Sequence, residues 1–308
     1  MSLARRSARR LKSSRNALRR RLFLEPLEDR VVLDAYSAAV LALNPIVFFD
    51  FNENGGSTAI DSAAYQGAND GTHVGTVNYV SGRSGAAGDT AAFYTAVGGS
   101  RTTIASATAA FTNIQAAANN QVTVVFWQWE DPAGQPRADS SFSGQNAANQ
   151  RIVQAHVPWS DNNVYWDAGN GTCCAAGMRL SVGTPAAAYE GRWVQWAFVK
   201  NGVTNVATIY RDGVQIANSG ASTLDFGVIT QFSVGGEPGG ANLFIGAIDD
   251  FAVYDTALSG AQIQALYNAA SGVAVEWDGG GDGVSWSDVN NWVGDTNIPD
   301  AANEIAVF

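Results

Sequence analysis

Charged residues are scarce in this chain, and one cationic type is almost absent. Only 15% of the 308 residues are charged, and the lysines are Lys12 and Lys200 alone. Two histidines, His73 and His156, are too few for a histidine-rich metal cluster. No run approaches the roughly 18–20 apolar residues that a membrane-spanning helix needs, so the sequence predicts no transmembrane segment.

Cysteine is equally rare, because the chain has only Cys173 and Cys174, which are neighbours. Adjacent Cα atoms lie about 3.8 Å apart across a trans peptide, below the roughly 4.4 Å at which ordinary disulfides begin. A conventional disulfide framework is therefore excluded, and stability must come from a core. The pair is either reduced and packed as two small apolar residues or joined in a strained vicinal disulfide.

Glycine, aromatic and apolar residues are plentiful instead. The chain has 33 glycines, 10% aromatic residues and 46% hydrophobic residues. This composition is typical of short strands joined by tight turns and not of a helical cytosolic enzyme. The length allows one large domain or two ordinary ones with a proper core.

The charge is divided unevenly along the chain. Residues 1–34 carry a net charge of +6 and residues 35–308 carry −16, which gives −10 in total. No nucleic-acid partner is expected for the acidic body, because phosphate contacts need cationic surface. Such a body suits an extracellular protein and divalent cations. The Arg-rich stretch 1–24 is predicted to be disordered, as a solvated tail or a nucleic-acid or membrane-surface arm, and it lacks the apolar segment of a secretory signal.

Strand-like segments begin at about Tyr36. The segment Val122–Trp129 is apolar on both faces, as a central sandwich strand should be. Two hairpin turns are predicted at Asn201-Gly202 and Asp212-Gly213, because these dipeptides readily adopt positive φ. Apolar residues at helical spacing predict a single short surface helix over Ser259–Ala269.

These patterns predict an all-β chain in three parts. A basic leader covers residues 1–35, a β-sandwich covers residues 36–272, and a further β-rich or repeat module begins in residues 273–308. The third part resembles the opening rung of a β-solenoid or repeat module. A single rung cannot bury its own face, so we expect the chain to be a fragment of a longer protein.

The segment Leu22–Ala35 reads LFLEPLEDRVVLDA. It resembles the N-terminal targeting element of large surface and exported proteins of planctomycete-type bacteria. The resemblance implies export and an extracellular or cell-surface location.

Three further segments resemble the laminin-G-like domain of the concanavalin A-like lectin/glucanase superfamily. They are Phe48–Ser57 (FFDFNENGGS), Gly191–Lys200 (GRWVQWAFVK) and Gly246–Ser259 (GAIDDFAVYDTALS). Gln195 stands where the family often has a histidine. The resemblance covers residues 36–272 and implies a concanavalin A-like jelly-roll sandwich of two antiparallel sheets.

The resemblance also implies a structural calcium ion (Ca2+) that ties the N-terminal loop to the last strand. The matching positions are Asn52, Glu53, Asp249 and Asp250, and their oxygen atoms are of the kind that calcium prefers. Successive side chains of a strand point to opposite faces, so only one of the two aspartates should reach the ion, and we favour Asp250. The alternative is that both end a strand and are solvated.

A catalytic site is not predicted. Retaining glycoside hydrolases need two carboxylates roughly 5–5.5 Å apart, and the glucanase branch places them on one strand as E-x-D-x-x-E or E-x-D-x-E. No such spacing occurs in this sequence, and Glu130-Asp131-Pro132 indicates a turn at a strand end. The sequence therefore predicts no enzymatic activity.

The region Gln154–Gly171 is dense in Trp, Tyr, Asn and Asp. Aromatic faces combined with planar amides and carboxylates suit sugars, whose CH groups stack while their hydroxyls are hydrogen-bonded. Tyr165 and Trp166 are expected on a strand with at least one of them in the core, whereas Trp159 is expected in a loop. The candidate ligand contacts are Trp159, His156, Asp161 and Asn162.

The sequence thus favours a non-catalytic extracellular recognition or adhesion module that binds glycans or surface proteins and carries a structural calcium. A spacer domain of a large surface protein and a diverged glycoside hydrolase are the alternatives. Fold class alone does not separate them, because binding loops on one fold vary freely.

Overall fold

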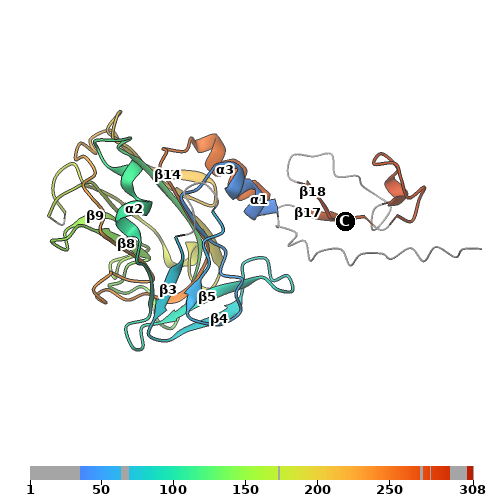
Figure 1. Cartoon of the computed structure of the whole chain (residues 1–308), viewed down its shortest axis with the longest axis horizontal. Helices are drawn as coiled ribbons and strands as arrows, with labels where there is room; N and C mark the ends of the chain where they lie inside the picture. The colour runs from blue at the N-terminus through green and yellow to red at the C-terminus, as the bar shows by residue number, and fades with distance from the viewer. Residues whose placement is uncertain are drawn as a thin grey trace, which may run out of the picture. The chain divides into compact units, whose positions relative to one another are not determined.

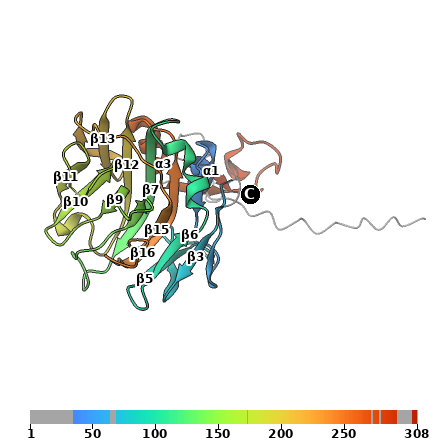
Figure 2. The ribbon, with the colours of Figure 1, turned by 60° about the vertical axis from the view of Figure 1, so that its left-hand side comes forward.

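The computed structural model describes residues 35–63, 69–172, 174–270, 273–277, 279–291 and 304–307. Almost all of the leader, with its export-like element, lies outside this part of the chain. Between residues 35 and 270 the strands form two large antiparallel sheets, which pack face to face (Figures 1 and 2). The predicted all-β jelly-roll sandwich is confirmed.

The first sheet, called sheet A, contains β1 (Val47–Phe49), β4 (Val77–Ser81), β5 (Thr90–Thr95), β7 (Gln121–Glu130), β12 (Trp193–Asn201), β13 (Val206–Arg211), β14 (Val214–Ser219) and β16 (Ile245–Tyr254). Their order is β14-β13-β12-β7-β16-β5-β4, and β1 pairs with β16. Strands far apart in sequence are therefore neighbours, as in a jelly roll.

The second sheet, called sheet B, contains β2 (Thr58–Ala59), β3 (Gly71–Val74), β6 (Arg101–Ile104), β8 (Phe142–Gln145), β9 (Arg151–His156), β10 (Asn163–Ala168), β11 (Arg179–Gly183) and β15 (Gln231–Val234). Their order is β11-β10-β9-β8-β15-β6-β3-β2. The strands β9, β10 and β11 form one edge region of this sheet, where His156 ends β9 and the other three candidate ligand residues lie in the loop between β9 and β10.

β7 lies between β12 and β16 at the centre of sheet A. Its residues Val124 and Phe126 point into the core between the sheets, while Val125 and Trp127 belong to a second apolar cluster on the outer face. Both faces of the strand are covered, which explains why its sequence is apolar without alternation. The prediction of a central strand here is confirmed.

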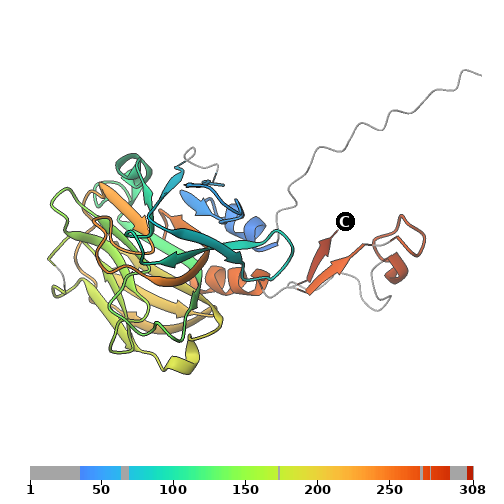
Figure 3. The ribbon, with the colours of Figure 1, turned by 90° about the horizontal axis from the view of Figure 1, so that it is seen from below.

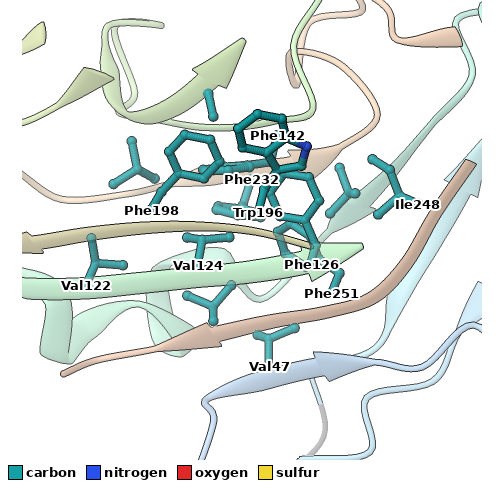
Figure 4. Close-up of a cluster of buried hydrophobic side chains, with 14 of the residues drawn as sticks. Val47, Val122, Val124, Phe126, Phe142, Trp196, Phe198, Phe232, Ile248 and Phe251 are labelled. Carbon is teal, nitrogen blue, oxygen red and sulfur yellow. The ribbon is translucent and has the colours of Figure 1, made fainter. Parts of the chain in front are cut away.

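The core between the sheets is rich in aromatic rings (Figure 4). Phe142 of β8 is its hub, with ring centroids 5.8 to 6.2 Å from five other rings. Those rings belong to Phe126, Trp166, Phe198, Phe232 and Phe251. Trp166 is fully buried, as expected for one member of the Tyr165-Trp166 pair.

The two predicted hairpin turns differ. Asp212 and Gly213 both have positive φ, 49° and 75°, and join β13 directly to β14 as a two-residue turn. The turn after Asn201 is longer, because β13 starts only at Val206, and the positive φ of 58° falls on Asn205. The Asn201 side chain accepts hydrogen bonds from the two backbone N–H groups that follow Gly202, which favours the wider loop.

Two helices, α1 (Ala35–Ala42) and α3 (Gly260–Ala270), lie side by side (Figure 3) and pack on the outer face of sheet A. The strand-like expectation from Tyr36 onward was wrong for α1. Alanine fills half of its eight positions and favours a helix. Tyr36 and Val40, one turn apart, bury its inner face.

The predicted α3 is confirmed together with its N-cap. Ser259 Oγ accepts a 3.3 Å hydrogen bond from the backbone N–H of Gln262, and Gln262 Oε1 accepts a 2.9 Å bond from the backbone N–H of Ser259. This reciprocal pair is a capping box, which satisfies two N–H groups at the helix start. The remaining short helices are α2 (Ala107–Ala110), η1 (Thr112–Ile114), η2 (Ala186–Ala188) and η3 (Val289–Asn291).

The C-terminal part contains β17 (Val273–Glu276) and β18 (Glu304–Val307), which pair in parallel. Asp282 Oδ1 accepts hydrogen bonds from the N–H groups of Val284 and Ser285 and from Asn291 Nδ2, which closes a compact loop between them. The interpretation of this part as the start of a repeat module stays a prediction. Within the described residues, no helix has the length and apolar character needed to cross a membrane.

Candidate functional site

Three of the four predicted ligand residues line one open pocket of about 210 Å³. His156 is the last residue of β9, and Trp159 and Asp161 lie in the loop that leads to β10. We call this the Trp159 pocket. Its lining residues are Arg151, His156, Trp159, Asp161, Tyr165, Cys174 and Arg179.

Aromatic rings form the apolar part of the Trp159 pocket. The rings of His156 and Trp159 meet edge to face with centroids 4.5 Å apart. Tyr165 of β10 is the cross-strand partner of His156, and its ring centroid lies 6.3 Å away. Trp159 and Tyr165 are both half-buried, so part of each ring faces solvent. Such rings suit stacking against the CH face of a sugar.

Ion pairs fix the polar part of the pocket. Asp167 of β10 is fully buried and binds Arg179 through two hydrogen bonds of 2.6 Å each. Arg151 lies 3.2 Å from the same carboxylate and 3.2 Å from Glu237. The Arg179 guanidinium also stacks over the Tyr165 ring at 4.4 Å. The ion pairs of both arginines and the stacking of Arg179 hold the two guanidinium groups in defined positions.

The protonation of the pocket follows from its contacts. Burial lowers the pKa of His156 to about 4, so the imidazole is neutral at pH 7. Its Nδ1 lies 2.5 Å from the backbone carbonyl of Asp139, and donation to that carbonyl leaves Nε2 as the acceptor. The hydroxyl of Tyr165 donates a 2.7 Å hydrogen bond to Asp161, which lowers the pKa of that carboxyl.

Asn162 does not line the Trp159 pocket with the other three predicted residues. Its Oδ1 accepts a 2.6 Å hydrogen bond from Tyr189, and its φ of 62° closes the turn between Trp159 and Asn163. Asparagine tolerates this left-handed conformation better than most residues. The structure therefore places Asn162 in the loop that carries Trp159.

Cys174 lies on the pocket rim, is exposed and is disulfide-bonded. Cys173, the only other cysteine in the chain, lies outside the described residues. The vicinal disulfide stays a prediction, and intact mass under non-reducing conditions tests it.

Sequence reasoning missed the two arginines of the pocket, Arg151 and Arg179. A signal for Arg179, the cross-strand partner of Asp167, was present in the strand period of two. On β9 the outward positions include Gln154 and His156, and on β10 they are Asn163, Tyr165 and Asp167. Asp167 is a buried charge, which required cationic partners on the neighbouring strands.

The predicted calcium ligands of the N-terminal loop, Asn52 and Glu53, accept hydrogen bonds from protein groups, and their binding of calcium stays a prediction. Asn52 Oδ1 accepts a 2.8 Å hydrogen bond from the backbone N–H of Thr90. Glu53 accepts from the backbone N–H of Ile60 at 2.5 Å and from the Tyr79 hydroxyl at 3.1 Å. Among the residues that the structure describes, no group of three His, Cys, Asp or Glu side chains could hold a metal ion.

Asp249 and Asp250 both contact Arg83, although strand alternation predicted that their side chains point to opposite faces. Asp250 Oδ2 lies 2.5 Å from Arg83 Nε, and Asp249 Oδ2 accepts a 2.9 Å hydrogen bond from the Arg83 backbone N–H. A β-bulge between Asp249 and Ala252, with a φ of 50° at Asp250, breaks the strand alternation. A guanidinium therefore supplies positive charge to Asp250, one of the predicted ligands.

A second concavity of about 290 Å³ lies on the outer face of sheet A. It is lined mainly by apolar groups, among them Phe93 and the cross-strand pair Trp129 and Trp193. A binding site needs a few polar groups to orient its ligand. Asp161, Arg151 and Arg179 provide such groups in the Trp159 pocket, which we therefore take as the candidate site.

The class of protein follows from this geometry: a two-sheet jelly-roll sandwich that carries an open pocket of aromatic and charged side chains. The chain belongs to the concanavalin A-like lectin/glucanases superfamily, whose laminin G sequence profile matches residues 98–264. The match includes every described lining residue of the Trp159 pocket.

Solved structures show the same fold at low sequence identity. One is domain 4 of AbnA, a GH43 extracellular arabinanase from Geobacillus stearothermophilus, in complex with arabinotriose. It is 20% identical with a TM-score of 0.53, and the alignment covers 73% of this chain and 98% of that domain. The botulinum neurotoxin type G receptor-binding domain is 13% identical with a TM-score of 0.52, over 73% of this chain and 51% of that domain. This chain therefore spans about half of the neurotoxin binding domain. No curated protein matches the chain.

Proposed function

We propose that this chain is a non-catalytic recognition module that acts outside the cell and binds neutral glycans in the Trp159 pocket. The observation that carries the proposal is the pocket itself, where the half-buried rings of Trp159 and Tyr165 lie beside Asp161 and two fixed arginines. Rings provide stacking, and carboxylate and guanidinium groups provide hydrogen bonds to hydroxyls.

The charge balance favours neutral sugars over acidic ones. The cationic groups Arg151 and Arg179 are paired with the buried Asp167, and Arg151 also binds Glu237. Asp161, exposed at the rim, adds a further negative charge. An acidic sugar would therefore meet no net positive charge in the pocket. Domain 4 of AbnA was solved with arabinotriose, which makes neutral pentose and hexose oligosaccharides the first probes to use.

A glycan array with the wild type and with Trp159→Ala tests the proposal. We expect the variant to lose at least about tenfold in affinity, which is roughly 1.4 kcal/mol, because the stacking surface is gone. Trp193→Ala is the matched control, since Trp193 is also half-buried but lies in the sheet A concavity. Loss of binding in Trp193→Ala with retention in Trp159→Ala would move the site to that concavity.

A spacer domain of a large surface protein is the first alternative. Under it, no neutral glycan, acidic glycan or surface protein would bind the wild type above background. If the wild type bound a surface protein and Trp159→Ala weakened that binding, the chain would still be a recognition module, but its ligand would be a protein and not a glycan. The export-like element Leu22–Ala35 supports an extracellular role under both readings.

A diverged glycoside hydrolase is the second alternative. The structure brings two carboxylates, Glu130 and Asp139, to one buried region, but their side chains are 1% and 0% exposed. Catalytic carboxylates must flank a bound sugar, so their burial supports a non-catalytic role. Release of reducing sugar from arabinan or glucan by the wild type, and not by Glu130→Gln, would overturn this part of the proposal.

A further inference from the structure

Lys200, near the end of β12, is a lysine that the fold encloses completely. The residue is 0% exposed, and its Nζ donates hydrogen bonds to the backbone carbonyls of Ala168, at 2.9 Å, and Leu224. Nζ also lies 4.9 Å from the centroid of the Phe226 ring. Burial lowers the pKa of Lys200 to about 8, so part of the population carries a neutral amine at neutral pH. A neutral lysine amine in apolar surroundings is a nucleophile.

Asn120 lies on the same face of sheet A as Lys200. The cross-strand partner of Lys200 is Val122, and Asn120 precedes Val122 by two residues. Lys200 and Asn120 are therefore diagonal neighbours, whose Cα atoms lie roughly 7–8 Å apart, a distance that a long side chain spans. Their shared face is the inner one, because Val122 and Phe198 belong to the core between the sheets (Figure 4).

Gly202 leaves the space that the Asn120 amide occupies. The backbone N–H of Gly202 donates a 2.8 Å hydrogen bond to the Asn120 backbone carbonyl, so these two residues lie opposite each other just beyond the paired strands. A Cβ added to Gly202 would overlap Nδ2 and Cγ of Asn120. Gly202 follows Lys200 by two residues, and such positions share a face. The Asn120 amide is therefore held over the strand face from which the Lys200 side chain rises.

The short segment 224–226 contacts both side chains. Lys200 Nζ donates to the Leu224 carbonyl. Asp225 Oδ1 accepts a 2.7 Å hydrogen bond from Asn120 Nδ2, and the backbone N–H of Phe226 donates a 3.0 Å hydrogen bond to Asn120 Oδ1. The charge of Asp225 also acts on Lys200, where it opposes the larger effect of burial on the pKa. Three consecutive residues thus gather an amine, an amide and a carboxylate.

The contacts of the Asn120 amide favour attack on its carbonyl carbon. The N–H of Phe226 is a fixed donor to Oδ1, and such a donor stabilises the negative charge that develops on this oxygen when Cγ is attacked. The Asp225 carboxylate touches Nδ2, the nitrogen that would leave, and can carry a proton to it. Asp225 is exposed, so ammonia released there can reach solvent.

We propose that Lys200 and Asn120 form a covalent amide cross-link, an intramolecular isopeptide bond between β12 and the start of β7, with Asp225 as the proton carrier. The Lys200 ammonium gives one proton to Asp225, and the neutral Nζ attacks Cγ of Asn120. The Nζ–Cγ bond forms and the Cγ–Nδ2 bond breaks after Asp225 has passed its proton to Nδ2. The ammonia takes the excess proton of Nζ and leaves as ammonium, so atoms and charge balance and nothing is oxidised or reduced.

The cross-link provides a covalent restraint that a reducing agent does not open. It ties the start of β7 to β12, which neighbour each other at the centre of sheet A although they are far apart in sequence. Closing such a long loop stabilises a fold mainly because it restricts the unfolded chain. The cross-link is independent of the proposed binding of glycans at Trp159.

Mass spectrometry of the full chain tests the proposal. The protein is kept at pH 8 for one day and measured after reduction of its disulfide. We expect the wild type to be lighter than its sequence by one ammonia molecule. In a tryptic digest, residues 102–137 should be joined to residues 193–211, because trypsin does not cleave after an acylated Lys200.

Two variants remove the reaction in different ways. Lys200→Met keeps the apolar stem and removes the amine, whereas Asp225→Asn removes the proton carrier at an exposed position where folding should be retained. Both should keep the ammonia and give separate peptides. Without the cross-link, Asp225→Asn should also have a Tm about 10 °C lower than the wild type.

Asp255→Asn is the matched control. Asn113 Nδ2 donates a 2.9 Å hydrogen bond to Asp255 Oδ2, which is a second amide–carboxylate pair. The lysines of the chain are Lys12 and Lys200 alone, and the proposal assigns Lys200 to Asn120. The control should therefore lose ammonia and give the joined peptide as the wild type does.

Three outcomes contradict the proposal. The first is a wild type with the full mass of its sequence. The second is a loss of ammonia with separate peptides, which would indicate a succinimide at an Asn-Gly pair such as Asn201-Gly202 and not a cross-link. The third is an ammonia loss that persists in Lys200→Met. Equal cross-linking in Asp225→Asn and the wild type would overturn the role of Asp225.

Discussion

Arg83 and Asp250 form an ion pair that is almost fully shielded from water. Arg83 Nε lies 2.5 Å from Asp250 Oδ2, and the two side chains are 5% and 4% exposed. The guanidinium also stacks over the ring of Tyr36 from α1 at 4.3 Å and lies 5.5 Å from the ring of Trp127. The pair thereby connects the loop after β4, the last long strand and the N-terminal helix.

Asp250→Asn should lower the free energy of unfolding by about 3–5 kcal/mol, because it leaves the Arg83 charge buried without its partner. Asparagine tolerates the positive φ of 50° at this position, so backbone strain does not add to the effect. Asp212→Asn is the control. Asp212 also has positive φ and an arginine partner, Arg192, but that pair is 44% and 20% exposed.

Urea unfolding of the two variants provides the measurement. The exposed pair should contribute no more than about 1 kcal/mol. If Asp250→Asn and Asp212→Asn lowered the free energy of unfolding equally, burial would not make the Arg83–Asp250 pair more important for stability than an exposed pair.

Phe142→Ala should lower the free energy of unfolding by about 3–5 kcal/mol, because it leaves a cavity where five aromatic rings converge. Val214→Ala, at a side chain that is 58% exposed, should change it by less than about 0.5 kcal/mol. Chemical denaturation monitored by tryptophan fluorescence measures both. A loss below 1 kcal/mol for Phe142→Ala would contradict the assignment of this ring as the centre of the core.

Gly213→Ala should destabilise the β13–β14 hairpin by about 1–2 kcal/mol, because alanine is strained at positive φ. The φ of Gly213 is 75°, and an added Cβ would lie 2.8 Å from Gln264 Nε2 and 3.0 Å from the Cβ of Tyr267 on α3. Gly220→Ala is the control, because no atom lies within 4 Å of its added Cβ. Thermal unfolding should separate the two variants by several degrees, and equal Tm values would count against a strained turn.

The stability of the protein should depend on the protonation of His156 in mildly acidic solution. Burial lowers its folded-state pKa from 6.5 to about 4, so the unfolded chain binds the proton first as the pH falls. The contribution of neutral His156 is therefore fully present above pH 6.5 and is lost as the pH falls toward 4. His73 behaves in the same way, since burial lowers its pKa to about 4 as well.

Unfolding free energies of the wild type and of His156→Gln at pH 7 and pH 5 measure this effect. The difference in the free energy of unfolding between the two pH values should be smaller in His156→Gln, because one of the two histidines with a lowered pKa is gone. Asp139, whose pKa is raised to about 8, acts in the opposite direction in both proteins and cancels in the comparison. An unchanged pH difference would show that His156 does not titrate with unfolding.

The sequence alone predicted only some of the side chains that meet at the Trp159 pocket. His156, Trp159 and Asp161 lie within six residues of one another, so a loop could present them together without knowledge of the fold. Arg179 comes from β11 and binds Asp167 across the sheet. That contact depends on strand pairing, which local pattern does not specify.

The same distinction holds for the charged sites. Strand alternation at Asp249-Asp250 predicted one inward and one outward carboxylate. The bulge in β16 interrupts this alternation, so both carboxylates contact Arg83. A bulge depends on how two strands are matched in length and twist, which is a property of the sheet. Arg83 is 166 residues from Asp249, and nothing local to either residue pairs them.

The amino-acid sequence by itself determined the all-β class, the central strand β7, the Asp212-Gly213 turn and the capped helix α3. Each depends on contacts between residues near in sequence, where side-chain periodicity and turn propensity decide the outcome. Only the tertiary structure decided which charges are buried and what compensates them, at Asp250 with Arg83 and at Asp167 with Arg151 and Arg179. Burial depends on which distant strands and loops come together, and it is burial that makes an ordinary carboxylate require a cation.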